Sequence, residues 1–120
     1  MLFKDLKAYQ HARRLSVLSR PLINRLPRSE GDIADQWRRA CNSVVLNLAE
    51  GVSRRGSKEF RRFADIARGS LVEVEAVIDL VQHLGLFDPR ELEEVMATRD
   101  ECAKTVYGLL RKLSTAAASV

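Results

Sequence analysis

The stretch SKEFRRFADIARGSLVEVEAVIDLVQHL, residues 57–84, decides the fold of this chain. Apolar and small residues recur along it in alternating steps of three and four, at Phe60, Phe63, Ala67, Ser70, Val74, Val77, Val81 and Leu84. This spacing places one continuous stripe on a single face of an α-helix, and it is typical of helices that pack lengthwise against each other. Gly85 follows directly and is expected to end the helix in a left-handed conformation.

Three other segments show the same periodicity, so we predict helices at about 3–26, 32–51, 57–84 and 88–115. The sequence contains no Asn-Gly or Asp-Gly turn and no alternating run of β-branched residues that would indicate strands. Four amphipathic helices with short connections pack most simply as an antiparallel, up-down-up-down four-helix bundle. The predicted fold class is therefore all-α, with residues 1–120 forming a single domain.

Local signals mark the expected helix ends. Ser29 offers an N-cap for the second helix, and Ser57 offers one for the third. The sequence DPRE at residues 88–91 supplies an N-cap, a proline at the first helical position and an acid at the third. Pro21 lacks an amide donor and crowds a carbonyl one turn earlier, so we predict a bend in the first helix there.

Length and composition narrow the class of protein. The 120 residues are 46% hydrophobic and 30% charged, with few prolines and glycines, which is typical of one globular domain. No apolar run approaches the roughly 20 residues that span a bilayer, and no signal peptide precedes the charged start. The two cysteines, Cys41 and Cys102, are too few for a disulfide scaffold. We therefore expect a cytoplasmic protein with reduced thiols.

Charge is distributed unevenly along the chain. Residues 1–68 hold 15 basic and 7 acidic side chains, whereas residues 69–120 hold 5 basic and 9 acidic ones. Such asymmetry suits self-association, in which an acidic face of one copy meets a basic face of another. A dense basic cluster interrupted by one acid, Glu59, comprises Arg54, Arg55, Lys58, Arg61 and Arg62. A focus of positive charge attracts polyanions, although a solvated basic corner without a ligand is the alternative.

Two polar residues lie where the apolar stripes would pass through the core, Asn47 and Ser70. A buried amide or hydroxyl needs hydrogen-bond partners, and a structural role is the expected one for both. Ser70 could bond a carbonyl one turn back, and Asn47 could tie the end of its helix to the following loop. Gly51 ends the second predicted helix, and Glu50 stands four residues before Arg54, where a surface ion pair can form.

A search for catalytic or metal-binding constellations finds little. His11 and His83 lie on different predicted helices, and neither has the glutamate three residues earlier that di-iron bundles use. Asp79 and His83 could touch at a spacing of four, for which a surface pair is the expected role. The chain has no glycine-rich phosphate loop and no Cys-x-x-Cys motif. We therefore expect no catalytic residues, no metal and no cofactor.

A long string of residues resembles a known family. It comprises SVVLNLAEG at 43–51, then Arg54, Ser57, Glu59, Phe60 and Phe63, then IARGS at 66–70 with Glu73. The similarity extends upstream to QWRRA at 36–40 and to residues near the start of the chain. The chain resembles the bacterial four-helix bundle proteins associated with intervening sequences in large-subunit ribosomal RNA genes. That family is related to the accessory variability determinant proteins of diversity-generating retroelements.

The resemblance implies a small bundle that assembles into a homopentamer with a basic surface. Its retroelement relatives bind nucleic acid and a reverse transcriptase. A ring would repeat the basic cluster fivefold, so that weak contacts become avid. The first hypothesis is thus a non-enzymatic oligomeric bundle that binds RNA or DNA through phosphates, as a scaffold. The alternative is a protein-interaction module that binds a protein partner, with the arginines serving subunit contacts. A third hypothesis, an RNA-processing enzyme, rests only on Asp79 and His83 and on the genetic neighbourhood of relatives.

Overall fold

The structure, a computed structural model, describes residues 1–118, so the last two residues of the predicted domain lie outside the described part. Two short 3-10 helices and four α-helices follow one another along the chain: η1 Phe3–Asp5, α1 Lys7–Asn24, η2 Arg28–Glu30, α2 Gly31–Ser53, α3 Ser57–His83 and α4 Pro89–Ala118. No strand occurs within this range. The predicted all-α class is confirmed.

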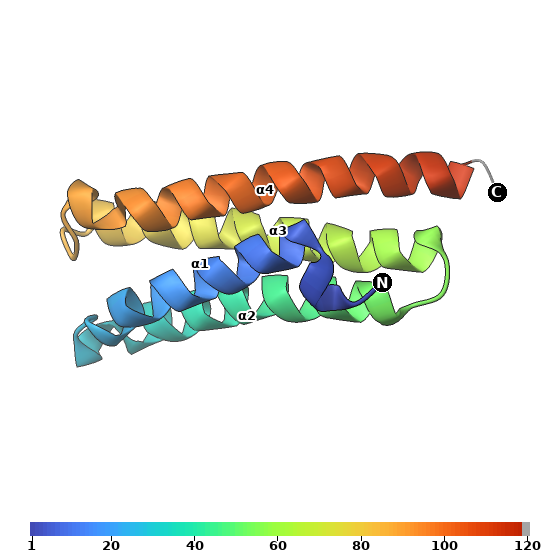
Figure 1. Ribbon diagram of the computed structural model, residues 1–120. Helices are drawn as coiled ribbons and strands as arrows, with labels where there is room; N and C mark the ends of the chain where they lie inside the picture. Colours follow the sequence, from blue (N-terminus) through green and yellow to red (C-terminus); the bar gives the residue numbers. More distant parts are fainter. Residues whose placement is uncertain (119–120) are drawn as a thin grey trace.

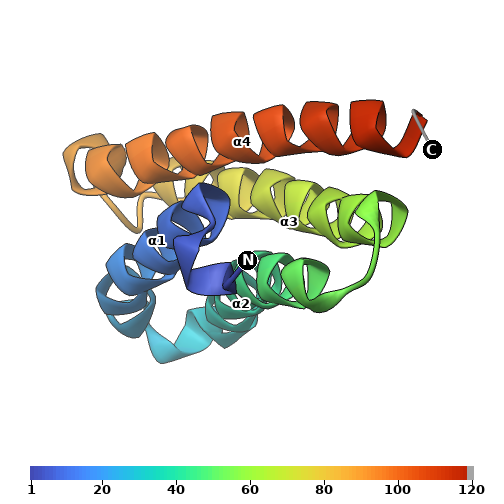
Figure 2. The same ribbon diagram turned by 45° about the vertical axis from the view of Figure 1, so that its right-hand side comes forward.

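The four long helices run up and down in alternation along one elongated axis (Figures 1 and 2). Each helix lies beside the next along the chain, and α4 also lies beside α1, whereas between residues 1 and 118 no Cα atoms of the diagonal pairs α1–α3 and α2–α4 come within 8 Å of each other. The molecule measures 50 × 21 × 20 Å. This closed square of neighbours is an up-down-up-down four-helix bundle, as the short predicted connections require.

The apolar stripe of α3 lines the core along most of its length. Ala67, Val74 and Val81 are completely buried, and they face buried side chains of all three other helices, among them Leu15, Trp37, Val44, Leu48, Val95 and Val106. The two ends of the stripe differ from this pattern. Phe60 and Phe63 are only half-buried, and Leu84 is exposed.

The first predicted helix is divided in two. Leu6 adopts an extended conformation between η1 and α1, and its amide donates to the carbonyl of Phe3. The break lets η1 fold back, so that the Phe3 ring meets the Tyr9 ring edge-on at 4.9 Å. Pro21 lies inside α1, which continues to Asn24, and the predicted bend there stays a prediction.

The capping predictions had different outcomes. Asp88 caps α4 as predicted, because its carboxylate accepts from the amide of Arg90 while its own amide donates to Glu91. The predicted caps at Ser29 and Ser57 are wrong. Ser29 lies inside η2, which runs directly into α2, and Ser57 is already the first helical residue of α3. Gly85 has φ +73°, as the left-handed helix end predicts.

Candidate nucleic-acid interface

The connection between α2 and α3 forms a tight corner at one end of the bundle. Gly56 has φ +84°, a conformation that favours glycine, and it turns the chain into α3. Gly51 does not end α2 as predicted but is buried within it, two residues before the helix ends. A Cβ at Gly51 would lie 2.8 Å from the Phe60 ring, so only glycine allows α2 and α3 to approach this closely.

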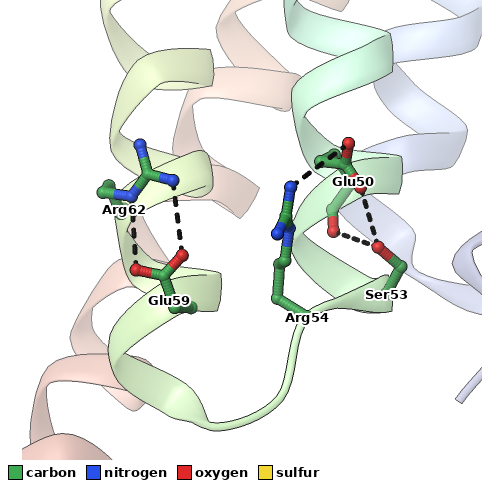
Figure 3. Close-up of polar contacts among 5 residues, drawn as sticks. All are labelled: Glu50, Ser53, Arg54, Glu59 and Arg62. Carbon is green, nitrogen blue, oxygen red and sulfur yellow. Dashed lines mark hydrogen bonds and ion pairs between the residues drawn. The ribbon is translucent and has the colours of Figure 1, made fainter.

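Arg54 is held at the end of α2 by its own helix. Its guanidinium lies 3.6 Å from Glu50 (Figure 3), which confirms the predicted ion pair. Its carbon Cζ lies 5.0 Å from the centre of the Phe63 ring. The Ser53 hydroxyl donates to the backbone carbonyl of Glu50 at 2.7 Å and lies 2.9 Å from its carboxylate. Arg54 is therefore partly neutralised and fixed in position.

Arg62 is held in a similar way on the first turns of α3. It donates two hydrogen bonds to Glu59, at 3.3 and 3.4 Å (Figure 3). Its Cζ lies 4.5 Å from the Phe63 ring centre. These bonds from Arg62, together with its positive charge, lower the pKa of Glu59 below its ordinary value. Two guanidinium groups from two helices thus share one aromatic ring, which joins the sides of the corner.

The other three cations of the cluster are less constrained. Arg61 donates through Nε to the hydroxyl of Ser114 at 2.7 Å and so links α3 to α4. Arg55 and Lys58 are exposed, and neither has an ion-pair or hydrogen-bond partner among residues 1–118. The structure brings all five predicted cations to one corner and sets them against two carboxylates, those of Glu50 and Glu59. The corner therefore carries a surplus of positive charge.

Two further cations lie near this corner that the sequence analysis did not assign to it. Arg111 and Lys112 precede Ser114, the α4 partner of Arg61, by less than one helical turn. Charge is distributed unevenly within the acidic part of the chain, residues 69–120. Its nine acids all lie at 73–101, whereas 102–118 holds only basic side chains. The antiparallel course of α4 returns this basic end to the α2–α3 corner (Figure 1). Counting the charges that follow Glu101 separately would have indicated it.

The polar residues on the apolar stripes form a small network between α2 and α3. Ser70 donates to the Ser43 hydroxyl at 2.7 Å, and the Asn47 amide donates to the carbonyl and hydroxyl oxygens of Ser43. Their structural role is thus supported, but the predicted partners are wrong. Ser70 bonds across to α2 instead of to its own helix, and Asn47 bonds back one turn instead of reaching the loop.

One buried charge was missed by the sequence analysis. Arg99 on α4 is only 9% exposed and donates to the backbone carbonyl of Leu71 on α3 at 3.1 Å. It also donates twice to Asp100, at 2.7 and 3.0 Å, which offsets the cost of burying its charge. The neighbouring acid was the available signal, since an arginine on an apolar stripe needs a carboxylate beside it.

The remaining candidate residues form exposed or inert groups. His83 Nδ1 lies 3.4 Å from the Asp79 carboxylate, and both side chains are largely exposed, as expected for a surface pair. Burial raises the pKa of the Cys41 thiol and raises that of Cys102 to about 12. Within residues 1–118, no three side chains of metal-binding type gather at one point. None of the described helices is long and apolar enough to cross a membrane.

The fold and the corner define a class: a small antiparallel four-helix bundle with a cationic surface where its second and third helices meet. Residues 4–108 match the 23S rRNA-intervening sequence protein family. The chain therefore belongs to that family, which confirms the resemblance that the AEG and ARGS segments indicated. Among curated proteins, none matches this chain.

Proposed function

We propose that this protein is a non-enzymatic, oligomeric four-helix bundle that binds RNA or DNA through phosphate contacts and serves as a scaffold in a nucleoprotein complex. The observation that carries the proposal is the surplus of cations at the α2–α3 corner, where Arg55 and Lys58 have no acidic partner among the described residues. Unpaired surface cations release counterions from phosphates on binding, which is the source of sequence-independent affinity.

The assembly is part of the same proposal. A cytoplasmic homopentamer of this chain would present five copies of the corner, and linked weak sites bind a long polyanion far more tightly than one site does. The long acidic segment at 73–101 and the basic α1–α2 half give each copy two faces of opposite charge. Such faces favour a head-to-tail arrangement in which every subunit meets its neighbour in the same way.

The test uses two variants with equal loss of charge. Arg55, Lys58 and Arg61 are replaced by alanine in one, and Arg20, Arg28 and Arg39, exposed at the other end of the bundle, are replaced in the matched control. Fluorescence anisotropy then measures the affinity for mixed-sequence RNA and DNA over a range of salt concentrations. We expect the corner variant to bind more weakly, with a salt slope smaller by about 2 for single strands, and the control to change little.

Equal effects of the two variants would contradict a localised site and leave only attraction by net charge. Light scattering coupled to size exclusion accompanies the binding measurement and gives the oligomeric state. If the corner substitutions dissociate the oligomer, the arginines serve subunit contacts and the phosphate assignment is wrong. Absence of any binding at low salt would reject the proposal.

A protein-interaction module is the second candidate, and a specific observation favours it. Leu46, Val72 and Leu80 are 65%, 53% and 45% exposed on the outer faces of α2 and α3. Large apolar patches exposed on a surface are typical of sites that bind other proteins. Replacing these three residues with serine would then abolish capture of a protein partner but leave nucleic-acid affinity unchanged.

A further inference from the structure

Tyr107 on α4 differs from every other aromatic residue of the chain. The chain has four Phe, two Tyr and one Trp, all within the described residues, and only Tyr107 is exposed, at 62%. The other rings pack in the core, against each other, or beneath the arginines of the corner. Within residues 1–118, the Tyr107 ring has no ring or cation contact, and its hydroxyl has no hydrogen-bond partner.

Basic residues flank Tyr107 on its own helix. Lys104 precedes it by three positions and Arg111 follows it by four, so the three side chains share one exposed face of α4. No acidic residue occurs between Lys104 and the end of the described chain. On α4 the ring therefore lies between two cations, with no acid after Glu101 on its own helix.

The neighbouring helix adds further cations at the same level. Two hydrogen bonds join α3 to α4 on either side of Tyr107: Arg61 to Ser114, and Arg99 to the Leu71 carbonyl. Because the helices are antiparallel, α3 residues between 61 and 71 run alongside α4 residues between 99 and 114 (Figure 1). Arg68 lies in this interval, half-exposed and paired with Asp65 at 2.9 Å. Arg61 belongs both to this group of cations and to the α2–α3 corner.

We propose that Tyr107 is a stacking platform for an unpaired base, within a site for single-stranded nucleic acid that Arg61, Arg68, Lys104 and Arg111 complete. This inference rests on the proposed binding of nucleic acid at the corner and extends the path of the strand from there onto α4. A cationic groove with an exposed aromatic ring is the combination that binds single strands, because phosphates pair with the cations while a base stacks on the ring. Duplex bases are already stacked and leave the ring unused.

The experiment compares Tyr107→Leu and Tyr107→Phe with the unaltered protein, using a labelled mixed-sequence 20-mer as single strand and as duplex. Stacking on one aromatic residue contributes roughly 1–3 kcal/mol, so Tyr107→Leu should weaken single-strand binding by about 5- to 150-fold. Tyr107→Phe keeps the ring and should bind almost as the unaltered protein does. Duplex affinity and the salt slope should not change, since no phosphate contact is lost.

A matched control and the oligomeric state separate the possible outcomes. Leu80→Ala removes an exposed apolar side chain from the other end of α3 and should leave single-strand binding intact. If Tyr107→Leu binds the single strand as tightly as the unaltered protein, the stacking proposal is wrong while phosphate binding at the corner stands. If the unaltered protein binds neither strand form, the proposed function itself fails. If Tyr107→Leu changes the mass in light scattering, the ring contacts a second copy and the proposal is overturned.

Discussion

Both ends of the bundle hold an arginine over a phenylalanine ring beside a glutamate, yet the two ends differ in what is left over. At the end that joins α3 to α4, Arg25 lies 2.6 Å from Glu91 and 5.1 Å from the Phe87 ring centre, and it connects α1 to α4. At the α2–α3 corner, Arg54 pairs with Glu50 and lies over Phe63. At the first end the arginine joins two helices and is matched by its glutamate, whereas the corner also holds Arg55 and Lys58, which have no acidic partner among the described residues.

The two phenylalanine rings, Phe87 at one end and Phe63 at the other, are buried to different degrees. Phe87 is 5% exposed and meets the fully buried Trp37 edge-on at 6.3 Å, so that end is closed by packing. Phe63 is half-buried, and at the corner the ring is covered by two guanidinium groups instead of by apolar side chains. A binding surface is therefore indicated by the cations that have no carboxylate partner, and not by the number of arginines.

The largest expected effect concerns packing at the closed end. Trp37→Ala removes a completely buried indole, and we expect a loss of about 3–5 kcal/mol in the free energy of unfolding. Phe63→Ala at the corner should cost clearly less, because that ring is half-exposed. Urea unfolding followed by circular dichroism measures both, since Trp37 is the only tryptophan available for fluorescence. Equal losses would contradict the distinction between a packed and a charged end.

A smaller effect tests the close approach of helices at the corner. Gly51→Ala places a Cβ against Phe60 and Phe63, so we expect destabilisation by about 1 kcal/mol despite the better helix propensity of alanine. Gly69→Ala is the matched control on α3, because nothing lies within 4 Å of its Cβ. It should stabilise the protein by about 0.5–1 kcal/mol. Thermal unfolding of both variants gives the comparison, and effects of the same sign would rule out the close contact.

Single arginine substitutions test whether an arginine without a carboxylate partner contributes more to nucleic-acid affinity than a paired one. Arg55→Ala should reduce nucleic-acid affinity more than Arg54→Ala, because the Arg54 guanidinium is already paired with Glu50. Arg25→Ala at the other end should leave affinity unchanged, since its charge is matched by Glu91. Each lost phosphate contact lowers the salt slope by roughly 0.7–0.9. Anisotropy titrations at three salt concentrations give the slopes, and a larger effect of Arg25→Ala would invert the comparison.

The smallest expected effect is a shared response to acid. Hydrogen bonds from Arg62 and Arg25 lower the pKa values of Glu59 and Glu91 below the ordinary 4.5. A carboxylate with a lowered pKa in the folded state adds stability above pH 4.5, and this stability is lost as the pH falls through the folded pKa. Glu59→Gln and Glu91→Gln should each flatten the fall in Tm between pH 6 and pH 3. Glu93→Gln controls for the loss of one negative charge, and an equal flattening there would contradict the pairing.

Much of the fold follows from the local pattern. Steps of three and four at residues 60–84 predicted the core face of α3, and the DPRE segment predicted the start of α4 together with its cap. Helix ends that lack capping residues of this kind were harder to predict. Leu6 breaks the first helix although nothing in its local sequence forbids a helix, because folding η1 back places Phe3 against Tyr9. That gain comes from a tertiary contact, which periodicity does not contain.

The candidate site was predictable only as a cluster of like charges. The sequence placed Arg54 to Arg62 close together, and the spacing from Glu50 to Arg54 predicted their ion pair. It could not predict that Arg61 bonds to Ser114 on α4, or that Arg54 and Arg62 share the Phe63 ring. Those contacts depend on how neighbouring helices are aligned, which side-chain packing decides.

The sequence by itself therefore determined the helical class, the number of long helices, their alternating course and the presence of a basic segment between the second and third. Spacing and capping act over a few residues, so the chain carries that information locally. Tertiary structure alone decided which charges remain free. Antiparallel packing returns Arg111 to the corner, buries Arg99 beside Asp100, and leaves Tyr107 exposed among cations. Electrostatic interactions act through space, so their outcome depends on which helices become neighbours.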